Sequence, residues 1–191
     1  FANVNNNFNL CPIYLKPKVN KNILFQFFKF VYYYSSTFII NPNAFIKYLN
    51  LEKQDGVKFL QRWKNLYFNS YIIKQPIDWL HFSFTTLVLK RENVALSINA
   101  KMSTSIRGYD ISIYPLKNPG CYTKVWSKID KIHAISKDLL TSARIEGLND
   151  LDKTVIIHPA IDEKYFRKNK KTTSKIYGKD KILFLTVARL H

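Results

Sequence analysis

The residues best suited to chemistry lie together on one turn, which runs through Arg107, Gly108, Tyr109 and Asp110. The stretch before them is rich in apolar and hydroxyl side chains, which predicts a strand that breaks at Gly108. Glycine allows the backbone to bend sharply there or to lie close to a ligand. Ligands of open α/β sheets bind beyond the carboxyl ends of the strands, so this turn predicts a polar binding site. The alternative is a strand end with an ordinary ion pair.

Strand and helix patterns alternate around this turn. The expected strands are 77–84, 100–106, 131–135 and 154–158, and the expected helices are 57–75, 87–98, 122–129 and 136–147. Ser136 is well placed to cap the last helix, and Gly147 to end it. This order predicts the α/β class, with a parallel sheet flanked by helices.

The region before the first strand is mostly apolar and aromatic. We expect loop over 1–22 and a buried helix over 23–40, because Gln26, Lys29 and 35–37 interrupt that run too often for a membrane-spanning segment. The alternative for 23–40 is a helix that lies in a bilayer surface. Asn41 and Pro42 predict the start of a second helix. A third helix should bury one stripe of side chains, which consists of Val57, Leu60, Trp63, Tyr67 and Tyr71.

Composition narrows the class of protein. The chain has 191 residues, 47% of them hydrophobic, which favours a folded core over disorder. A net charge of +17 suits nucleic acid, an anionic membrane surface or a phosphorylated substrate, although a biased amino-acid usage would also produce it. Cys11 and Cys121 are far apart, which argues against a disulfide framework or a zinc site and fits a reducing cytoplasm.

Common catalytic and nucleotide-binding motifs are missing from the sequence. It contains no P-loop, dinucleotide fingerprint, Gly-x-Ser-x-Gly elbow or His-x-x-x-His pair. Asp150 and Asp152 form an Asp-x-Asp match, which we attribute to chance. Residues 163–181 are basic and polar, which predicts a linker, and 182–187 predict the first strand of a second domain.

Five short motifs follow one another at suitable spacing, and they lie at 78–81, 105–110, 132–136, 155–166 and 184–190. This series resembles family 4 of the retaining glycosyltransferases, which have the GT-B fold, especially members of bacterial exopolysaccharide and colanic-acid-type synthesis. The resemblance covers 77–191, whereas 1–76 match only in general character.

The resemblance implies two Rossmann-like domains that face each other across a cleft. Residues 1–162 would form the N-terminal domain, which takes the acceptor, and 182–191 would begin the domain that takes the nucleotide-sugar. The protein would transfer a sugar with retention to a lipid-linked saccharide or polysaccharide, with no cofactor and no metal. We expect a cytoplasmic enzyme that docks on the anionic inner face of the plasma membrane and has no nucleic-acid partner. The alternatives are a basic nucleic-acid-binding module and a sugar-nucleotide epimerase of the same fold.

Individual positions carry over from the family's motifs. Arg189 matches an arginine that contacts the donor diphosphate. Arg107 stands where many members have histidine in a His-Gly-x-Asp turn, and arginine is a poor proton acceptor. Arg107 should therefore bind an anionic group, and Asp110 should orient Arg107 or a sugar hydroxyl.

The remaining predicted site residues are substrate-binding ones: Gly108, Tyr109, His81 and Ser136. His81 matches the first histidine of an Asp-x-x-His-x-His pattern whose second position is Ser83. Most of the family's donor site would follow His191, so residues 1–191 alone are expected to have no transfer activity.

Overall fold

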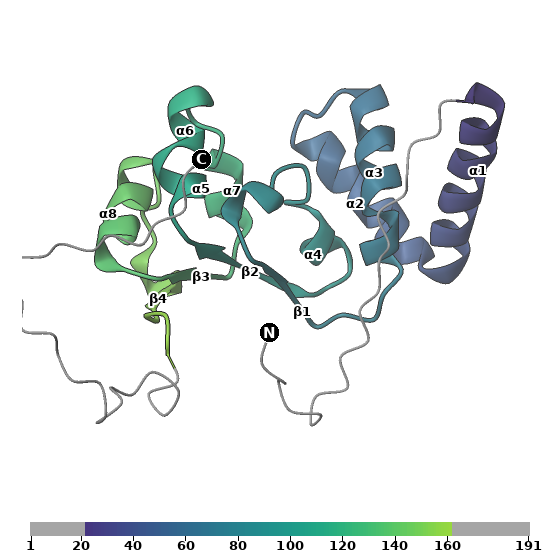
Figure 1. The fold of residues 1–191 in the computed structure, drawn as a ribbon. Coiled ribbons are helices and arrows are strands. Elements are labelled where there is room, and N and C mark those ends of the chain that lie inside the picture. The colour runs from purple at the N-terminus through teal and green to yellow at the C-terminus, as the bar shows by residue number, and fades with distance from the viewer. Residues whose placement is uncertain (1–21, 162–191) are drawn as a thin grey trace, which may run out of the picture. The chain divides into compact units, whose positions relative to one another are not determined.

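The computed structural model describes residues 22–161 (Figure 1). The described residues up to His158 belong to one compact unit. Its first part holds three helices, α1 (Ile23–Ile40), α2 (Pro42–Gln54) and α3 (Phe59–Ile73). The predicted linker, the predicted strand 182–187 and Arg189 lie outside the described residues.

Four strands and several short helices follow α3. The strands are β1 (Trp79–Phe82), β2 (Lys101–Ile106), β3 (Lys131–Ala134) and β4 (Thr154–Ile156). The connecting helices are η1 (Thr85–Leu87), α4 (Val94–Ser97), α5 (Tyr109–Ser112), α6 (Tyr114–Lys117), α7 (Thr123–Lys128), α8 (Lys137–Ile145) and η2 (Leu151–Lys153). All four predicted strands are therefore present, although β1, β3 and β4 are shorter than expected.

The strands form one parallel sheet in the order β1-β2-β3-β4. Because this order follows the chain, right-handed crossovers place every connection on the same face of the sheet. Figure 1 shows α4, α5, α7 and α8 on that one side. The prediction of an α/β parallel sheet flanked by helices is thus confirmed, and the fold is Rossmann-like. All four carboxyl ends lie at one edge, which we call the carboxyl edge.

The two faces of the sheet differ in chemistry. On the helix side Phe82, Met102 and Ile132 are buried against residues such as Val125 and Trp126 of α7. Side chains alternate along a strand, so the residues between them point to the opposite face. That face, which we call the open face, carries Trp79, His81, Ser103, Ser105 and His133.

A second core joins the first three helices to α4. Buried side chains of α2 and α3, among them Tyr48, Leu66 and Ile73, pack with Val94. The predicted start of α2 is confirmed, since the Asn41 side chain accepts a hydrogen bond from the Ala44 N–H at 3.2 Å and Pro42 occupies the first turn.

The expectation that 23–40 form a buried helix is right about the helix and wrong about the burial. Only Gln26 and Thr37 of α1 are buried. The helix packs on the rest of the unit with one side, where Phe30 and Tyr33 contact Tyr67 of α3. Most of its apolar side chains are exposed. By length and mean hydropathy alone, α1 could cross a membrane.

The predicted buried stripe of the third helix is also partly wrong. Tyr67 is buried, but Leu60 in the first turn of α3 is exposed. The buried side of α3 instead includes Asn65 and Asn69, whose amides donate hydrogen bonds to Glu52 at 2.8 Å and to the Tyr48 hydroxyl at 3.0 Å. Leu66 and Ile73 are buried on this side as well, so the buried side of α3 differs from the predicted stripe.

The helix expected over 87–98 is mostly a turn. Only η1 and the four residues of α4 are helical, and Lys90 between them has a φ of +66°, which ends any helix. Two buried side chains hold this turn. Asn69 donates to the Lys90 carbonyl at 2.8 Å, and Asn93 donates to Glu52 at 2.8 Å. Tertiary hydrogen bonds therefore override the local helical pattern.

Candidate functional site

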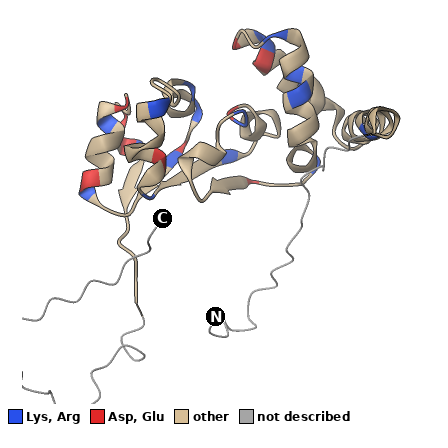
Figure 2. Cartoon of the chain, turned by 45° about the horizontal axis from the view of Figure 1, so that its top comes forward, with Lys and Arg blue, Asp and Glu red and all other residues tan. Residues whose placement is uncertain are grey.

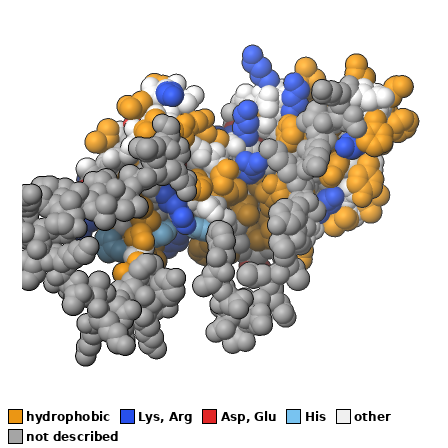
Figure 3. All heavy atoms as spheres, viewed as in Figure 1, with side chains coloured by type: hydrophobic (Ala, Val, Ile, Leu, Met, Phe, Trp, Pro, Cys, Tyr) orange, Lys and Arg blue, Asp and Glu red, His pale blue; other side chains and the backbone are white. Residues whose placement is uncertain are grey.

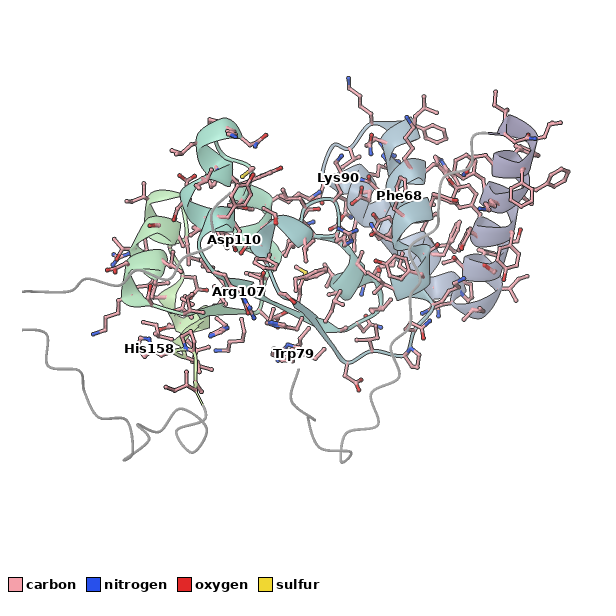
Figure 4. The ribbon with its side chains drawn as sticks, in the orientation of Figure 1. Phe68, Trp79, Lys90, Arg107, Asp110 and His158 are labelled. Atoms are coloured by element: carbon pink, nitrogen blue, oxygen red, sulfur yellow. The ribbon has the colours of Figure 1, made fainter. Side chains whose placement is uncertain are left out.

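The predicted turn lies at the carboxyl edge, directly after β2. Arg107 and Gly108 connect β2 to α5, and Asp110 lies in the first turn of that helix. Gly108 has a φ of +137°, a backbone conformation that a residue with a side chain adopts only under strain. In Figure 4 Asp110 lies on the helix side of the sheet, whereas Trp79 lies on the opposite side.

Asp110 is only 1% exposed, and both of its carboxylate oxygens are occupied by backbone donors. Oδ1 accepts from the N–H groups of Arg107 at 3.1 Å and Gly108 at 2.9 Å. Oδ2 accepts from the Thr85 N–H at 3.1 Å, and the Asp110 carbonyl accepts from the Tyr122 hydroxyl at 2.5 Å. Asp110 therefore joins the connection after β1 to the connection after β2.

Arg107 is exposed, and its guanidinium lies over the Phe84 ring at 5.6 Å from the ring centroid. Within residues 22–161 it forms no ion pair with an acid. Asp110 holds the backbone N–H of Arg107 rather than its side chain. The ordinary ion pair considered from the sequence is thus absent from the described residues, and the guanidinium can contact an anionic group from solution.

Two other predicted site residues also lie near the carboxyl edge. Tyr109 begins α5 with its side chain exposed. Ser136 follows β3 and caps α8, since its hydroxyl oxygen accepts from the Leu139 N–H at 3.4 Å. The capping role is confirmed, and a substrate contact of Ser136 remains a prediction.

His81 belongs to a row of hydrogen bonds across the open face. The Trp79 indole N–H donates to Ser103 Oγ at 2.7 Å, and Ser103 Oγ lies 2.8 Å from His81 Nδ1. His81 Nε2 lies 3.1 Å from Ser105 Oγ, which lies 3.0 Å from His133 Nδ1. We call these five residues the polar row. It ends where His133 Nε2 meets the Ile157 carbonyl oxygen at 3.0 Å.

The two ends of the polar row fix the direction of every bond when both histidines are neutral. The Ile157 carbonyl can only accept, so His133 Nε2 carries the proton and its Nδ1 accepts from the Ser105 hydroxyl. His81 Nε2–H then donates to Ser105, and His81 Nδ1 accepts from the Ser103 hydroxyl. Ser103 in turn accepts from the Trp79 indole, which can only donate. Both ring nitrogens of His81 are thereby occupied.

The surroundings of His81 favour this neutral form. Burial lowers the pKa of His81 below its ordinary value, and the nearby His133 and Arg107 lower it further. Arg107 follows Ser105 of the polar row by two positions, directly after the end of β2. His81 and Arg107 are therefore parts of one polar region, although Asp110 faces away from it.

Sequence reasoning missed Ser103, Ser105, Trp79 and His133 as members of this region. The signal that could have identified them is alternation: polar side chains take every second position of β2, and one histidine stands at the matching position of β1 and of β3.

No metal site emerges from the described part of the chain. Within residues 22–161 no three His, Cys, Asp or Glu side chains are close enough together to hold a metal ion. Cys121 is a free thiol, and burial raises its pKa. The prediction that no metal or cofactor is needed stays a prediction.

The fold and this region define an α/β protein with a Rossmann-like parallel sheet and a polar carboxyl edge. Comparison of the chain with protein-family models, curated proteins and solved structures finds no match.

Proposed function

We propose that this chain is the acceptor-side part of a retaining sugar transferase, which moves a sugar from a nucleotide-sugar to a lipid-linked saccharide or polysaccharide during cell-surface polysaccharide synthesis. The observation that carries the proposal is the position of Arg107, an exposed cation held at the carboxyl edge of a parallel sheet. The motif series of the sequence supports the same assignment.

Arg107 is suited to the charge that such a reaction develops. When the bond between a sugar and a diphosphate breaks, negative charge grows on the diphosphate, so a fixed cation stabilises the transition state more than the ground state. Arginine remains protonated throughout and offers several N–H donors to phosphate oxygens. In this proposal Arg107 binds the anionic group of donor or acceptor and does not act as a base.

Asp110 and His81 act as positioning residues in the proposed reaction. The three backbone N–H donors on Asp110 hold the turn that presents Arg107. His81 has both ring nitrogens engaged and orders the strand ends through the polar row. We assign neither residue a proton-transfer step. Tyr109, which is exposed beside Gly108, and Ser136 are the remaining candidates for a sugar contact.

Binding of an acceptor analogue tests the role of Arg107. We would titrate the chain with a saccharide linked through diphosphate to a short, water-soluble prenyl chain and follow binding by calorimetry. Arg107→Gln should weaken binding about tenfold or more, because one charge-assisted contact to a phosphate group is lost. Lys117→Gln is the matched control, since it removes another exposed cation, from α6.

Equal effects of the two substitutions would contradict the proposed site, because only the overall charge would then matter. Unchanged binding by the Arg107→Gln variant would contradict a contact between Arg107 and the diphosphate of the acceptor.

A further inference from the structure

The outer side of α1 is the most apolar exposed surface of the described residues. Six exposed apolar side chains share this side of the helix, before and after the exposed Ser35, and form a strip that we call the α1 strip: Phe27, Phe28, Val31, Tyr32, Phe38 and Ile39. Figure 3 shows hydrophobic side chains over this side of the molecule, where α1 lies. A soluble protein rarely leaves so large a contiguous apolar patch without a partner.

The inner side of α1 is more polar than its outer side. Gln26 is buried and donates to the Tyr67 hydroxyl at 3.1 Å. Thr37 is buried as well, and its hydroxyl donates to the Tyr33 carbonyl at 2.6 Å. The Tyr34 hydroxyl donates to the Trp63 carbonyl at 3.0 Å.

This arrangement is the reverse of an ordinary surface helix, which turns its apolar stripe inward and its polar side to water. It matches a helix in contact with lipid, where polar groups turn toward protein and apolar groups face the acyl chains. The three Phe residues of the α1 strip suit a helix that lies in a bilayer surface, because the apolar face of such helices is rich in Trp, Phe and Leu.

Charge around α1 favours an anionic surface. The helix contains no Asp or Glu, as Figure 2 also shows. Lys29 Nζ lies over the Phe25 ring at 5.1 Å, and Lys74 Nζ lies over the Tyr33 ring at 5.2 Å, so two cations flank the helix. The whole chain carries +17. This charge attracts anionic lipid headgroups and opposes close contact with a second copy of the chain.

We propose that α1 lies in the interface of an anionic phospholipid bilayer, with the α1 strip among the acyl chains and Lys29 and Lys74 at the level of the headgroups. The side of α1 that packs on α3 stays with the protein, so α1 lies along the bilayer surface rather than across it. This inference concerns a surface remote from Arg107 along the chain and does not depend on sugar transfer.

Flotation with vesicles tests the proposal. The chain should float with vesicles of phosphatidylcholine and phosphatidylglycerol. The double variant Phe28→Gln and Ile39→Gln should bind these vesicles at least about tenfold more weakly, because two inserted side chains are lost. Both residues are well exposed, at 68% and 77%, so the variant should fold normally, which circular dichroism would check.

The matched control is the double variant Leu116→Gln and Ile145→Gln, which changes side chains that are 76% and 80% exposed on α6 and α8. It should bind vesicles like the unaltered chain. In about 1 M salt, which screens charges beyond about 3 Å, the unaltered chain should keep part of its binding through the apolar contact.

Three results would overturn the proposal: no vesicle binding by the unaltered chain, an equal loss in the control variant, or complete loss of binding in high salt. A dimer in the absence of lipid, abolished by the α1 variant and detected by light scattering, would instead assign the α1 strip to a second copy. None of these outcomes depends on a nucleotide-sugar or an acceptor, so failure here leaves the proposed transfer reaction to its own test.

Discussion

Asp110 has a buried carboxylate surrounded by backbone N–H groups, an arrangement that suits anchoring rather than proton transfer. Asp110→Asn keeps the shape of the side chain but replaces one acceptor oxygen with an NH2 group, which would face backbone donors. We expect the free energy of unfolding to fall by about 1–3 kcal/mol, since buried donors lose their acceptor. Urea denaturation at neutral pH measures this change.

The exposed Asp152 of η2 provides the control for Asp110. Asp152→Asn should change the free energy of unfolding by less than about 0.5 kcal/mol. If the two variants were equally stable, the anchoring role of Asp110 would be wrong.

His81 should titrate below the ordinary histidine value of 6.5 in the folded protein. Because the unfolded chain then binds a proton more readily, the contribution of His81 to stability is complete above about pH 6.5 and is lost as the pH falls toward the lowered pKa. The free energy of unfolding should therefore decrease between about pH 7.5 and pH 5.5. Ring titration by NMR reports the pKa directly.

His81→Gln should flatten this pH dependence. His158→Gln is the comparison, because His158 lies outside the polar row and donates to the Ile135 carbonyl. A pKa of His81 at or above 6.5 would show that the neutral polar row is not the state in solution.

At the scale of elements, Asp55 ties α2 to α7 and to the turn before α4. Its Oδ2 accepts from Lys124 at 2.6 Å, Lys128 at 2.5 Å and Asn93 at 2.6 Å. Burial alone would raise the pKa of Asp55, but these hydrogen bonds outweigh burial and lower it to about 2. The resulting stability is complete above the ordinary value of 3.8 and is lost as the pH falls from there to about 2.

Asp55→Asn should lower the free energy of unfolding at neutral pH by about 1 kcal/mol, since partial exposure screens the lost bonds. The difference from the unaltered chain should shrink as the pH approaches about 2. Denaturation at a series of pH values measures both. Asp150→Asn is the control, because Asp150 forms an exposed pair with Lys153 at 3.3 Å, and a similar effect there would contradict the account.

The sheet could be predicted from the sequence because its signals are local. A stretch of apolar and hydroxyl side chains that breaks at Gly108 marks β2, and Ser136 marks the start of α8 by a cap that acts within three residues. The position of Arg107 at a strand end follows from the same signals, since parallel strands share one carboxyl edge.

What the sequence could not predict depends on contacts between distant residues. Asn69 holds the turn at Lys90. The buried side of α3 includes Asn65 and Asn69, which donate hydrogen bonds to Glu52 and Tyr48 of α2. The exposure of α1 depends on which of its sides packs on α3. The helical pattern of apolar side chains does not specify that side, because apolar residues occur all round the helix. Prediction of the polar row would have required the register of three strands, because no short motif contains its members.

At the scale of the whole molecule, the charge of +17 fits both the proposed function and nucleic-acid binding, and the strength and salt dependence of DNA binding separate the two. Scattered basic residues should bind duplex and single-stranded DNA only weakly, with an affinity that falls steeply between about 50 and 200 mM salt. Fluorescence titration at two salt concentrations measures this. Tight binding that survives the higher concentration would favour the nucleic-acid hypothesis.

Sugar transfer itself is the most direct test of the central claim. The protein translated from the whole reading frame that contains this chain would be given a panel of nucleotide-sugars and a diphosphate-linked saccharide acceptor, and release of nucleoside diphosphate would be followed. We expect release with at least one donor, a product with the donor's anomeric configuration, and at least about tenfold slower turnover in Arg107→Gln. No release with any donor, or full activity in Arg107→Gln, would contradict the account.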